Sequence, residues 1–200
     1  MSDIEGTLRS TGLSAIAGVD EAGRGPCAGP LVIASVIIKD VNAPELSRVR
    51  DSKALSEKAR ESLFDPIIEQ SLSYSIIEIS PEEIDLKGLH KCNLEGMRRA
   101  VNALTMIPDY VLTDGYAIEG LSIPTLAVWK GDQVAPSISA ASILAKVYRD
   151  RVMREFDAQY PEYGFAKHKG YITAAHTAAL NKYGATPIHR TSFSNIAALL

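Results

Sequence analysis

The feature that most constrains the fold is an unbroken apolar run, Leu31-Val-Ile-Ala-Ser-Val-Ile-Ile38. A strand with one face in water alternates polar and apolar residues, and this run does not. It therefore predicts a strand that is covered on both faces. A second apolar run, 13–19, precedes it, and only a glycine-rich turn separates the two. This short connection favours an antiparallel hairpin.

Strand and helix signals alternate along the rest of the chain. Further strands are expected at 73–80, 110–113 and 124–129, and helices at about 56–71, from 80 onward, at 89–104, 136–160 and 173–182. Residues 1–12 are expected to be a polar lead-in. The last two strands are too close together to hold a long helix between them. The pattern predicts a mixed, five-stranded α/β sheet with helices on both faces.

Length and composition suit one domain that spans residues 1–200. No apolar run approaches the roughly 20 residues of a membrane helix, and the acidic N-terminus lacks the layout of a secretory signal. Two cysteines, Cys27 and Cys92, are too few for a disulfide framework or a zinc site. We expect a cytoplasmic protein with no membrane association. A monomer is expected, because no apolar surface stripe is evident.

The charge is unevenly distributed, although the formal net charge is only −3. Residues 141–200 hold eight basic residues against four acidic ones. A basic end on an acidic body suits a polyanionic partner, and it equally suits a solvated helix face. Aromatic, histidine and cationic residues alternate at 163–171 and 188–190, a composition that is common in nucleic-acid grooves.

Acidic residues follow three of the predicted strands. Asp20 and Glu21 follow 13–19, Asp114 follows 110–113, and Asp132 follows 124–129. Because α/β sheets form their sites at strand ends, we expect these side chains to gather. Clustered carboxylates repel one another unless a cation lies among them, and Mg²⁺ and Mn²⁺ prefer oxygen ligands. The set predicts a divalent-metal site, although either later Asp alone would equally suit a plain turn.

A glycine-rich loop, Gly23-Arg24-Gly25, follows the first two acids. It is neither a Walker loop nor a dinucleotide fingerprint. Its backbone amides and its guanidinium suit the recognition of a phosphate or a sugar hydroxyl. The helix at 136–160 carries a stripe of two hydroxyls and two cations within about 80° of one another, which could follow a phosphate backbone or form an ordinary amphipathic face; its members are Ser139, Ser142, Lys146 and Arg149.

Taken together and in order, several motifs resemble the prokaryotic ribonuclease HII family. They are Gly18-Val-Asp-Glu-Ala-Gly-Arg-Gly-Pro26, Asp51-Ser-Lys53, Asp114-Gly115, Lys130-Gly-Asp132, the segment 137–146, Tyr163-Gly-Phe165, His168-Lys-Gly-Tyr171 and Ile188-His-Arg190. The resemblance implies a ribonuclease H-like fold, with a mixed five-stranded sheet flanked by helices. It also implies a helical C-terminal part, about 136–200, that contributes to substrate binding.

The same resemblance implies an endoribonuclease. Its substrates would be RNA–DNA hybrids and duplex DNA with embedded ribonucleotides, nicked on the 5′ side, as in ribonucleotide excision during DNA replication and repair. Two metal ions, Mg²⁺ or Mn²⁺, would catalyse the hydrolysis and leave 3′-hydroxyl and 5′-phosphate ends.

The resemblance also assigns roles to residues. Asp20, Glu21, Asp114 and Asp132 would be the catalytic, metal-binding carboxylates. Gly23, Arg24 and Gly25 would read the 2′-hydroxyl, and Tyr171 would pack on the sugar at the RNA-to-DNA junction. Phosphate contacts would come from Lys53, Lys146 and Arg149. Cys27 stands where an aliphatic residue is expected.

Two other functional classes are considered beside the nuclease. A non-catalytic module that binds hybrids would have little use for four clustered acids facing phosphates. Another two-metal nuclease on the same fold, such as a resolvase or a transposase-like enzyme, would not need Gly23-Arg24-Gly25 together with Tyr171. These features favour a ribonucleotide-sensing nuclease.

Overall fold

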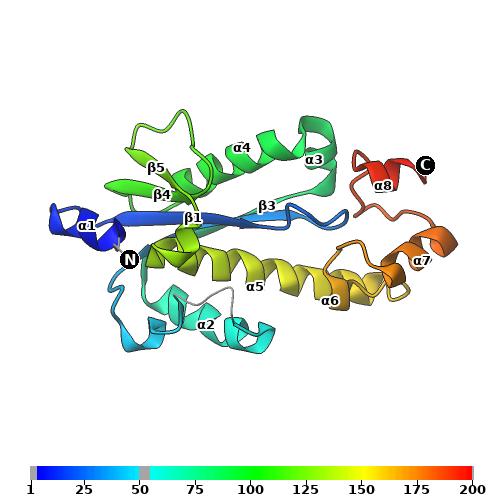
Figure 1. Cartoon of the computed structure of the whole chain (residues 1–200), viewed down its shortest axis with the longest axis horizontal. Coiled ribbons are helices and arrows are strands. Elements are labelled where there is room, and N and C mark those ends of the chain that lie inside the picture. The colour runs from blue at the N-terminus through cyan, green and yellow to red at the C-terminus, as the bar shows by residue number, and fades with distance from the viewer. Residues whose placement is uncertain (1–3, 50–54, 200) are drawn as a thin grey trace.

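A mixed five-stranded sheet forms the centre of the computed structural model, which describes residues 4–49 and 55–199 (Figure 1). The strand order is β3-β2-β1-β4-β5. β2 pairs antiparallel with both β1 and β3, whereas β1–β4 and β4–β5 are parallel. The predicted hairpin and mixed sheet are confirmed; the strands are β1 Ile16–Ala22, β2 Leu31–Ile38, β3 Ser71–Ile79, β4 Tyr110–Asp114 and β5 Thr125–Val128.

Most of the helices begin where the sequence signals place them. Ser56, Ser80 and Thr173 each accept a hydrogen bond from the backbone N–H three residues later, so all three are N-caps. Within the described ranges, no helix combines the length and the apolar character that a bilayer crossing requires. The α-helices are α1 Ile4–Ser10, α2 Glu57–Glu69, α3 Pro81–Lys87, α4 Leu89–Asn102, α5 Pro136–Gln159, α6 Phe165–His168, α7 Ala174–Tyr183 and α8 Ser194–Ala197; the 3-10 helices are η1 Pro44–Leu46 and η3 Gly131–Gln133.

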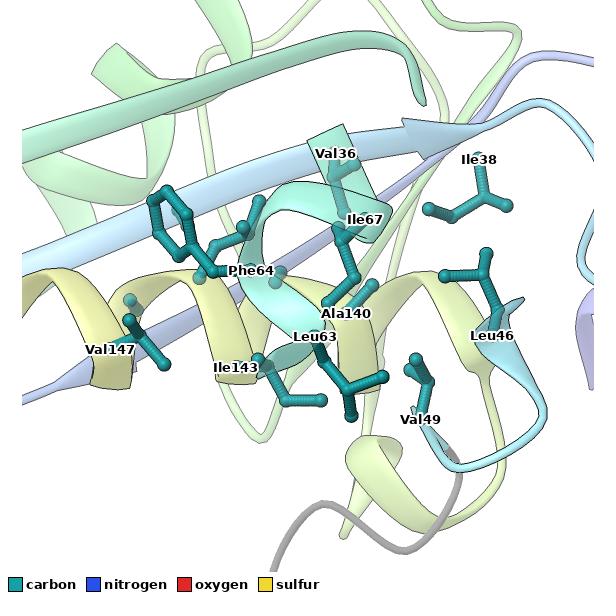
Figure 2. Packing of buried hydrophobic residues seen from close by; sticks show 14 of the residues in the cluster. Val36, Ile38, Leu46, Val49, Leu63, Phe64, Ile67, Ala140, Ile143 and Val147 are labelled. Atoms are coloured by element: carbon teal, nitrogen blue, oxygen red, sulfur yellow. The ribbon is translucent and has the colours of Figure 1, made fainter. Parts of the chain in front are cut away.

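β2 supplies side chains to two cores, one on each face of the sheet. Val36 and Ile38 pack with Phe64 of α2 and Ile143 of α5 on one face (Figure 2). The alternate residues Leu31, Ile33 and Ile37 belong to the core under α3 and α4. Since every residue of β2 is buried, the prediction of a strand covered on both faces is confirmed.

α5 lies directly against β1. A Cβ on Gly18 would stand 2.0 Å from the backbone carbon of Ser137, so only glycine allows this approach. The contact places the first turns of α5 beside the end of β1. Two distant segments of the chain thus meet at the site described below.

The N-terminal segment differs from the expected polar lead-in, since residues 4–10 form α1. Glu5 of this helix is buried, and its carboxylate accepts a hydrogen bond from the Ser137 N–H at 2.9 Å and one from Arg9 at 2.9 Å. Glu5 therefore caps the N-terminus of α5, where a negative charge is favourable. The helix was not predicted because its partner lies 132 residues away.

β1 also differs from its expected bounds of 13–19. It begins at Ile16 and continues through Asp20 and Glu21 to Ala22. Pairing with β2 extends over this whole end, with Asp20 opposite Ala34 and Glu21 opposite Ile33. The sequence pattern placed the first two acids after the strand, but in the structure they are part of it.

The C-terminal region packs on the segment that joins β1 to β2. Cys27 is buried with Met153, Phe165 and Ile196, in keeping with a packing role. Its N–H donates to Gly170 O at 3.0 Å, and its carbonyl accepts from Arg190 N at 2.8 Å. The connecting segment is thus enclosed by residues from the far end of the chain.

Candidate active site

The acids on β1 and β4 lie side by side. Val19 pairs with Thr113, so the next residues along these parallel strands are Asp20 and Asp114. Asp114 accepts a hydrogen bond from Gly131 N at 2.8 Å, which ties η3 to the end of β4. Asp132 is the next residue of η3 and is buried. Asp20, Glu21 and Asp114 are close enough to interact electrostatically, so the structure brings together three of the four acids that were expected to gather. Their role as metal ligands, and that of Asp132, stays a prediction.

The electrostatics of these acids follow from burial and mutual repulsion. Burial raises the pKa of Asp20 well above its ordinary value, and Glu21 and Asp114 raise it further. The Ser142 hydroxyl and the Glu21 N–H, 2.7 Å from Oδ1, hydrogen bond to Asp20 and oppose that shift. Burial raises the pKa of Glu21 to about 7, and the Arg24 guanidinium opposes this rise. The Arg24 Nη1 atom lies 3.6 Å from Glu21 Oε1.

The donor set fits a divalent cation. Glu21 Oε2 is buried and has no hydrogen-bond partner, so this oxygen is suited to coordinate a cation. Among the described residues, no three His, Cys, Asp or Glu side chains form a ready-made cage. Mg²⁺ requires only one or two protein carboxylates and takes its other ligands from water and phosphate. A cation here would also relieve the repulsion that raises the pKa of Asp20.

A pocket of about 380 Å³ lies beside these acids. The predicted loop residues, Gly23, Arg24 and Gly25, form part of its wall, and Tyr171 lines it as well. The Tyr171 ring reaches to 3.2 Å from the position that a Cβ on Gly25 would take, so glycine leaves room for the ring. Other lining residues are Glu21, Ala22, Arg60, Ser142, Ile143, Lys146 and Arg149.

Arg24 is held from two sides. Its guanidinium carbon lies 4.5 Å from the ring centroid of Tyr116, in addition to the ion pair with Glu21. Tyr116, and Arg60 of α2 as a lining residue, were not predicted from the sequence. Neither carries a motif signal, because each comes to the site only through the packing of its own element.

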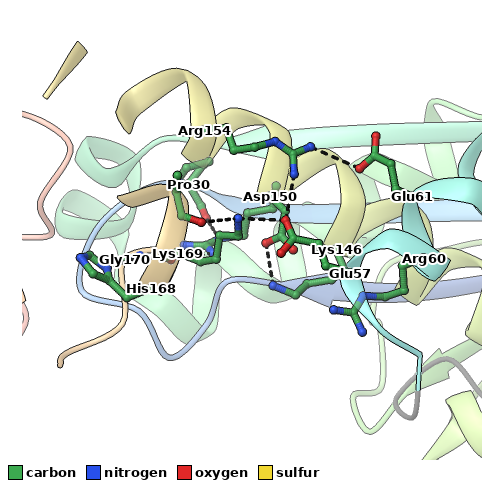
Figure 3. Close-up of polar contacts among 12 residues, drawn as sticks. Pro30, Glu57, Arg60, Glu61, Lys146, Asp150, Arg154, His168, Lys169 and Gly170 are labelled. Atoms are coloured by element: carbon green, nitrogen blue, oxygen red, sulfur yellow. Dashed lines mark hydrogen bonds and ion pairs between the residues drawn. The ribbon is translucent and has the colours of Figure 1, made fainter. Parts of the chain in front are cut away.

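The cations expected to contact phosphates have different surroundings. Arg149 is only 1% exposed and donates to Pro30 O, Lys169 O and Ala28 O at 2.9–3.0 Å. These three bonds engage the Arg149 guanidinium inside the protein, although the residue also lines the pocket, so its phosphate contact stays a prediction. Lys146 pairs with Asp150 at 2.6 Å but stays one-third exposed and lines the pocket (Figure 3). Lys53 lies outside the described residues.

The expected stripe on α5 does not form one phosphate-facing surface. Ser139 is buried and its hydroxyl donates to Val49 O. Ser142 hydrogen bonds with Asp20, and Arg149 points into the connecting segment. Of the four members, Ser142, Lys146 and Arg149 line the pocket, and Arg149 does so with its guanidinium bonded to backbone carbonyls.

A second buried arginine, Arg190, holds the glycine loop. Its Nη2 atom donates to Gly23 O at 2.6 Å and to Gly29 O at 2.9 Å, and its Nη1 atom donates to Arg24 O at 3.2 Å. Arg190 belongs to the motif Ile188-His-Arg190, but the sequence pattern did not predict its role. We infer that Arg190 and Arg149 position the loop, because together they engage carbonyls of Gly23, Arg24, Ala28, Gly29 and Pro30.

Ion pairs fix α2 and the turn before Tyr171 against α5. Lys169 Nζ lies 3.0 Å from Glu57, which also pairs with Arg154 at 2.8 Å (Figure 3). Arg154 reaches Glu61 at 3.2 Å. These pairs are partly exposed, so each contributes little to stability, but together they hold the turn that presents Tyr171.

Two buried histidines hold the backbone of Tyr171. Thr186 N–H donates to His189 Nδ1 at 2.9 Å, which leaves the His189 proton on Nε2. That Nε2 lies 3.0 Å from His176 Nε2, and His176 Nδ1 lies 3.0 Å from Tyr171 O. Both imidazoles are therefore neutral. Burial lowers the pKa of His189 to about 4, with a further contribution from His176, and burial lowers the pKa of His176 as well.

This histidine pair predicts a loss of stability in acid. The unfolded chain protonates His189 below its ordinary pKa of 6.5, whereas the folded chain resists protonation down to about 4. Its contribution to stability is thus complete above pH 6.5 and is lost as the pH falls towards 4. From about pH 7.5 to about 4.5 we expect a loss of about 2–3 kcal/mol from His189. Urea unfolding across this range measures it.

Two variants separate this effect from general acid unfolding. His189→Asn should remove most of the excess slope below about pH 6.5. His90→Gln changes an exposed histidine and should leave the slope as in the wild type. Equal slopes in all three proteins would contradict the assignment.

Comparisons with known proteins show which proteins the chain is similar to in sequence and in fold. The family model described as ribonuclease HII matches residues 17–196. The chain is 54% identical over 196 residues to "Ribonuclease HII" of Corynebacterium jeikeium, which covers 98% of this chain and 94% of that protein. The solved ribonuclease H2 of Pyrococcus horikoshii superposes with a TM-score of 0.80 at 30% identity, covering 92% and 96% of the two chains. Bst-RNase HIII in complex with Mn²⁺ shares the fold, with a TM-score of 0.71 at 17% identity and coverage of 92% and 68%.

Proposed function

The chain belongs to the ribonuclease HII family, and we propose that Asp20, Glu21, Asp114 and Asp132 hold the divalent cations with which it cleaves RNA. It cleaves the RNA strand of RNA–DNA hybrids and duplex DNA at embedded ribonucleotides. One observation supports this assignment of residues most directly. Acids from β1 and β4 lie side by side, next to a pocket that is lined by the glycine loop and Tyr171.

The protein's own groups prepare the site for the cation. When bound, Mg²⁺ or Mn²⁺ lowers the pKa of a water molecule and offsets charge on the scissile phosphate. Ser142 and the Glu21 N–H orient Asp20, and Gly131 orients Asp114. Lys146 lies at the pocket, where its ammonium can meet a phosphate. This arrangement supports hydrolysis that leaves 3′-hydroxyl and 5′-phosphate ends.

We assign recognition of the ribonucleotide to the glycine loop and Tyr171. Arg190 fixes the carbonyls of Gly23 and Arg24, and Tyr116 with Glu21 fixes the Arg24 guanidinium. The loop and Arg24 would then present donors to one 2′-hydroxyl at a defined position. The half-exposed Tyr171 ring would pack on the adjoining sugar. In this proposal residues 1–200 are one catalytic domain, with 136–200 supplying one wall of the substrate site.

A duplex DNA with a single ribonucleotide tests the proposal. With Mg²⁺ or Mn²⁺ we expect one nick on the 5′ side of that ribonucleotide, with a 3′-hydroxyl and a 5′-phosphate at the break. The all-DNA duplex of the same sequence should stay intact, and EDTA should stop cleavage. A cyclic phosphate product, or cleavage that persists in EDTA, would overturn the mechanism.

A further inference from the structure

A second, smaller pocket also has Glu21 in its wall. Its volume is about 210 Å³, and it is lined by Glu21, Asp114, Gly115, Tyr116, Trp129 and Lys130. Glu21 and Asp114 belong to the proposed metal site, so this pocket adjoins the reacting phosphate. Neither the motifs nor the proposed function assign a role to Trp129.

Trp129 is 81% exposed, which is unusual for the largest apolar side chain. It stands in the connection between β5 and η3, which is fastened at both ends. Gly115 N donates to Val128 O at 3.0 Å, and Gly131 N donates to Asp114 at 2.8 Å. The ring is thus mounted on the same backbone that orients Asp114, and it faces solvent beside the site.

Lys130 follows in a left-handed conformation, with φ of 53°. This conformation is uncommon outside glycine and costs about 1 kcal/mol or more in a long side chain. Lys130 lines the pocket together with Glu21 and Asp114. A cation and an exposed aromatic ring are the pair of groups that a nucleic-acid strand requires, one for a phosphate and one for a sugar or base.

The two pockets meet at Glu21. Both include Glu21, and Arg24 of the first pocket lies on the Tyr116 ring of the second. β4 and β5 lie over the N-terminal part of α5, whereas α6, which precedes Tyr171, lies towards its C-terminal part (Figure 1). A strand that passes over Glu21 would therefore meet Tyr171 on one side and Trp129 on the other.

We propose that Trp129 and Lys130 form a second substrate contact, which rests on the proposed function. The Trp129 ring packs on a sugar of the nucleic acid beyond the scissile phosphate, on the side opposite Tyr171, and Lys130 pairs with the adjoining phosphate. This contact tethers the substrate and leaves the chemical step to the acids.

The sequence offers a direct probe, because Trp129 is the only tryptophan in the chain. The Asp20→Asn protein is titrated with the single-ribonucleotide duplex in Mg²⁺ while tryptophan fluorescence is recorded. A saturable change in emission is expected, with the same midpoint as binding measured by a label on the DNA. Binding without any change in emission would overturn the contact.

Steady-state cleavage provides the second readout. Trp129→Ala should raise KM about 5- to 100-fold, with kcat changed less than about 3-fold. Trp129→Phe should recover most of the loss. Tyr74→Ala removes an exposed aromatic of β3 at the far edge of the sheet and should behave as the wild type. A wild-type KM in Trp129→Ala, or a loss confined to kcat, would overturn the proposal.

Salt dependence tests Lys130 separately. Lys130→Asn keeps a residue that tolerates the left-handed backbone and removes the charge. The slope of log affinity against log salt should fall by about 0.7–0.9. An unchanged slope would exclude the phosphate contact. If the wild-type protein does not nick the ribonucleotide duplex, the proposed function fails; if it nicks while Trp129→Ala matches it in KM, only the second contact fails.

Discussion

Asp20→Asn is expected to slow cleavage severely while making the metal-free protein more stable. Asp20 contributes a carboxylate to the proposed metal site and is buried beside Glu21 and Asp114. Loss of the carboxylate should lower kcat by about 10³-fold, equivalent to about 4 kcal/mol of transition-state stabilisation. Removing a buried charge from a repulsive cluster should raise the free energy of unfolding by about 1–2 kcal/mol. Single-turnover cleavage and thermal unfolding in EDTA measure the two effects.

Lower activity together with higher stability distinguishes a metal ligand from a residue that only supports the fold. Mg²⁺ or Mn²⁺ should raise the melting temperature of the wild type and raise that of Asp20→Asn much less. Asp65→Asn, on the exposed face of α2, is the matched control and should leave activity and stability unchanged. An Asp20→Asn protein that loses activity by unfolding, or that retains its response to metal, would contradict the assignment.

Arg190→Met is expected to cause the largest loss of stability among the single changes considered. The buried guanidinium donates to Gly23 O, Arg24 O and Gly29 O, and methionine would leave these carbonyls without their donor. The cost of breaking such a buried network is about 3–5 kcal/mol. Because the glycine loop would lose its brace, kcat should also fall more than about 10-fold at temperatures where the variant stays folded. Chemical unfolding and single-turnover rates provide the measurements.

A control variant on α5 shows whether the loss of stability comes from the lost support of the glycine loop or simply from the loss of an arginine charge. Arg154→Met removes an arginine whose two glutamate pairs are partly exposed, and it should cost less than about 1 kcal/mol. In Arg190→Met the acids are untouched, so stabilisation by Mg²⁺ or Mn²⁺ should persist even though cleavage is slow. Equal stability of the two variants, or wild-type cleavage by Arg190→Met, would refute a positioning role for Arg190.

Local pattern was sufficient for much of the architecture. The apolar run 31–38 predicted a doubly covered strand, and β2 supplies alternate residues to both cores. Ser56, Ser80 and Thr173 predicted helix starts because a cap is a contact over three residues. The acids at 20, 21, 114 and 132 were expected to gather because strand ends share an edge, and the parallel pairing of β1 with β4 brings the first three together.

Tertiary structure decided where the long polar side chains find their partners. The sequence by itself determined that residues 13–38 contain two strands, two acids and a glycine loop with one arginine. It could not show that Arg149 turns inward, that Glu5 caps α5, or that Arg190 holds a loop 167 residues earlier in the chain. Nor could the sequence show that the Trp129 side chain is exposed to solvent. Periodicity and capping are encoded within a few residues, whereas the partner of a buried charge is set by which distant segments pack together.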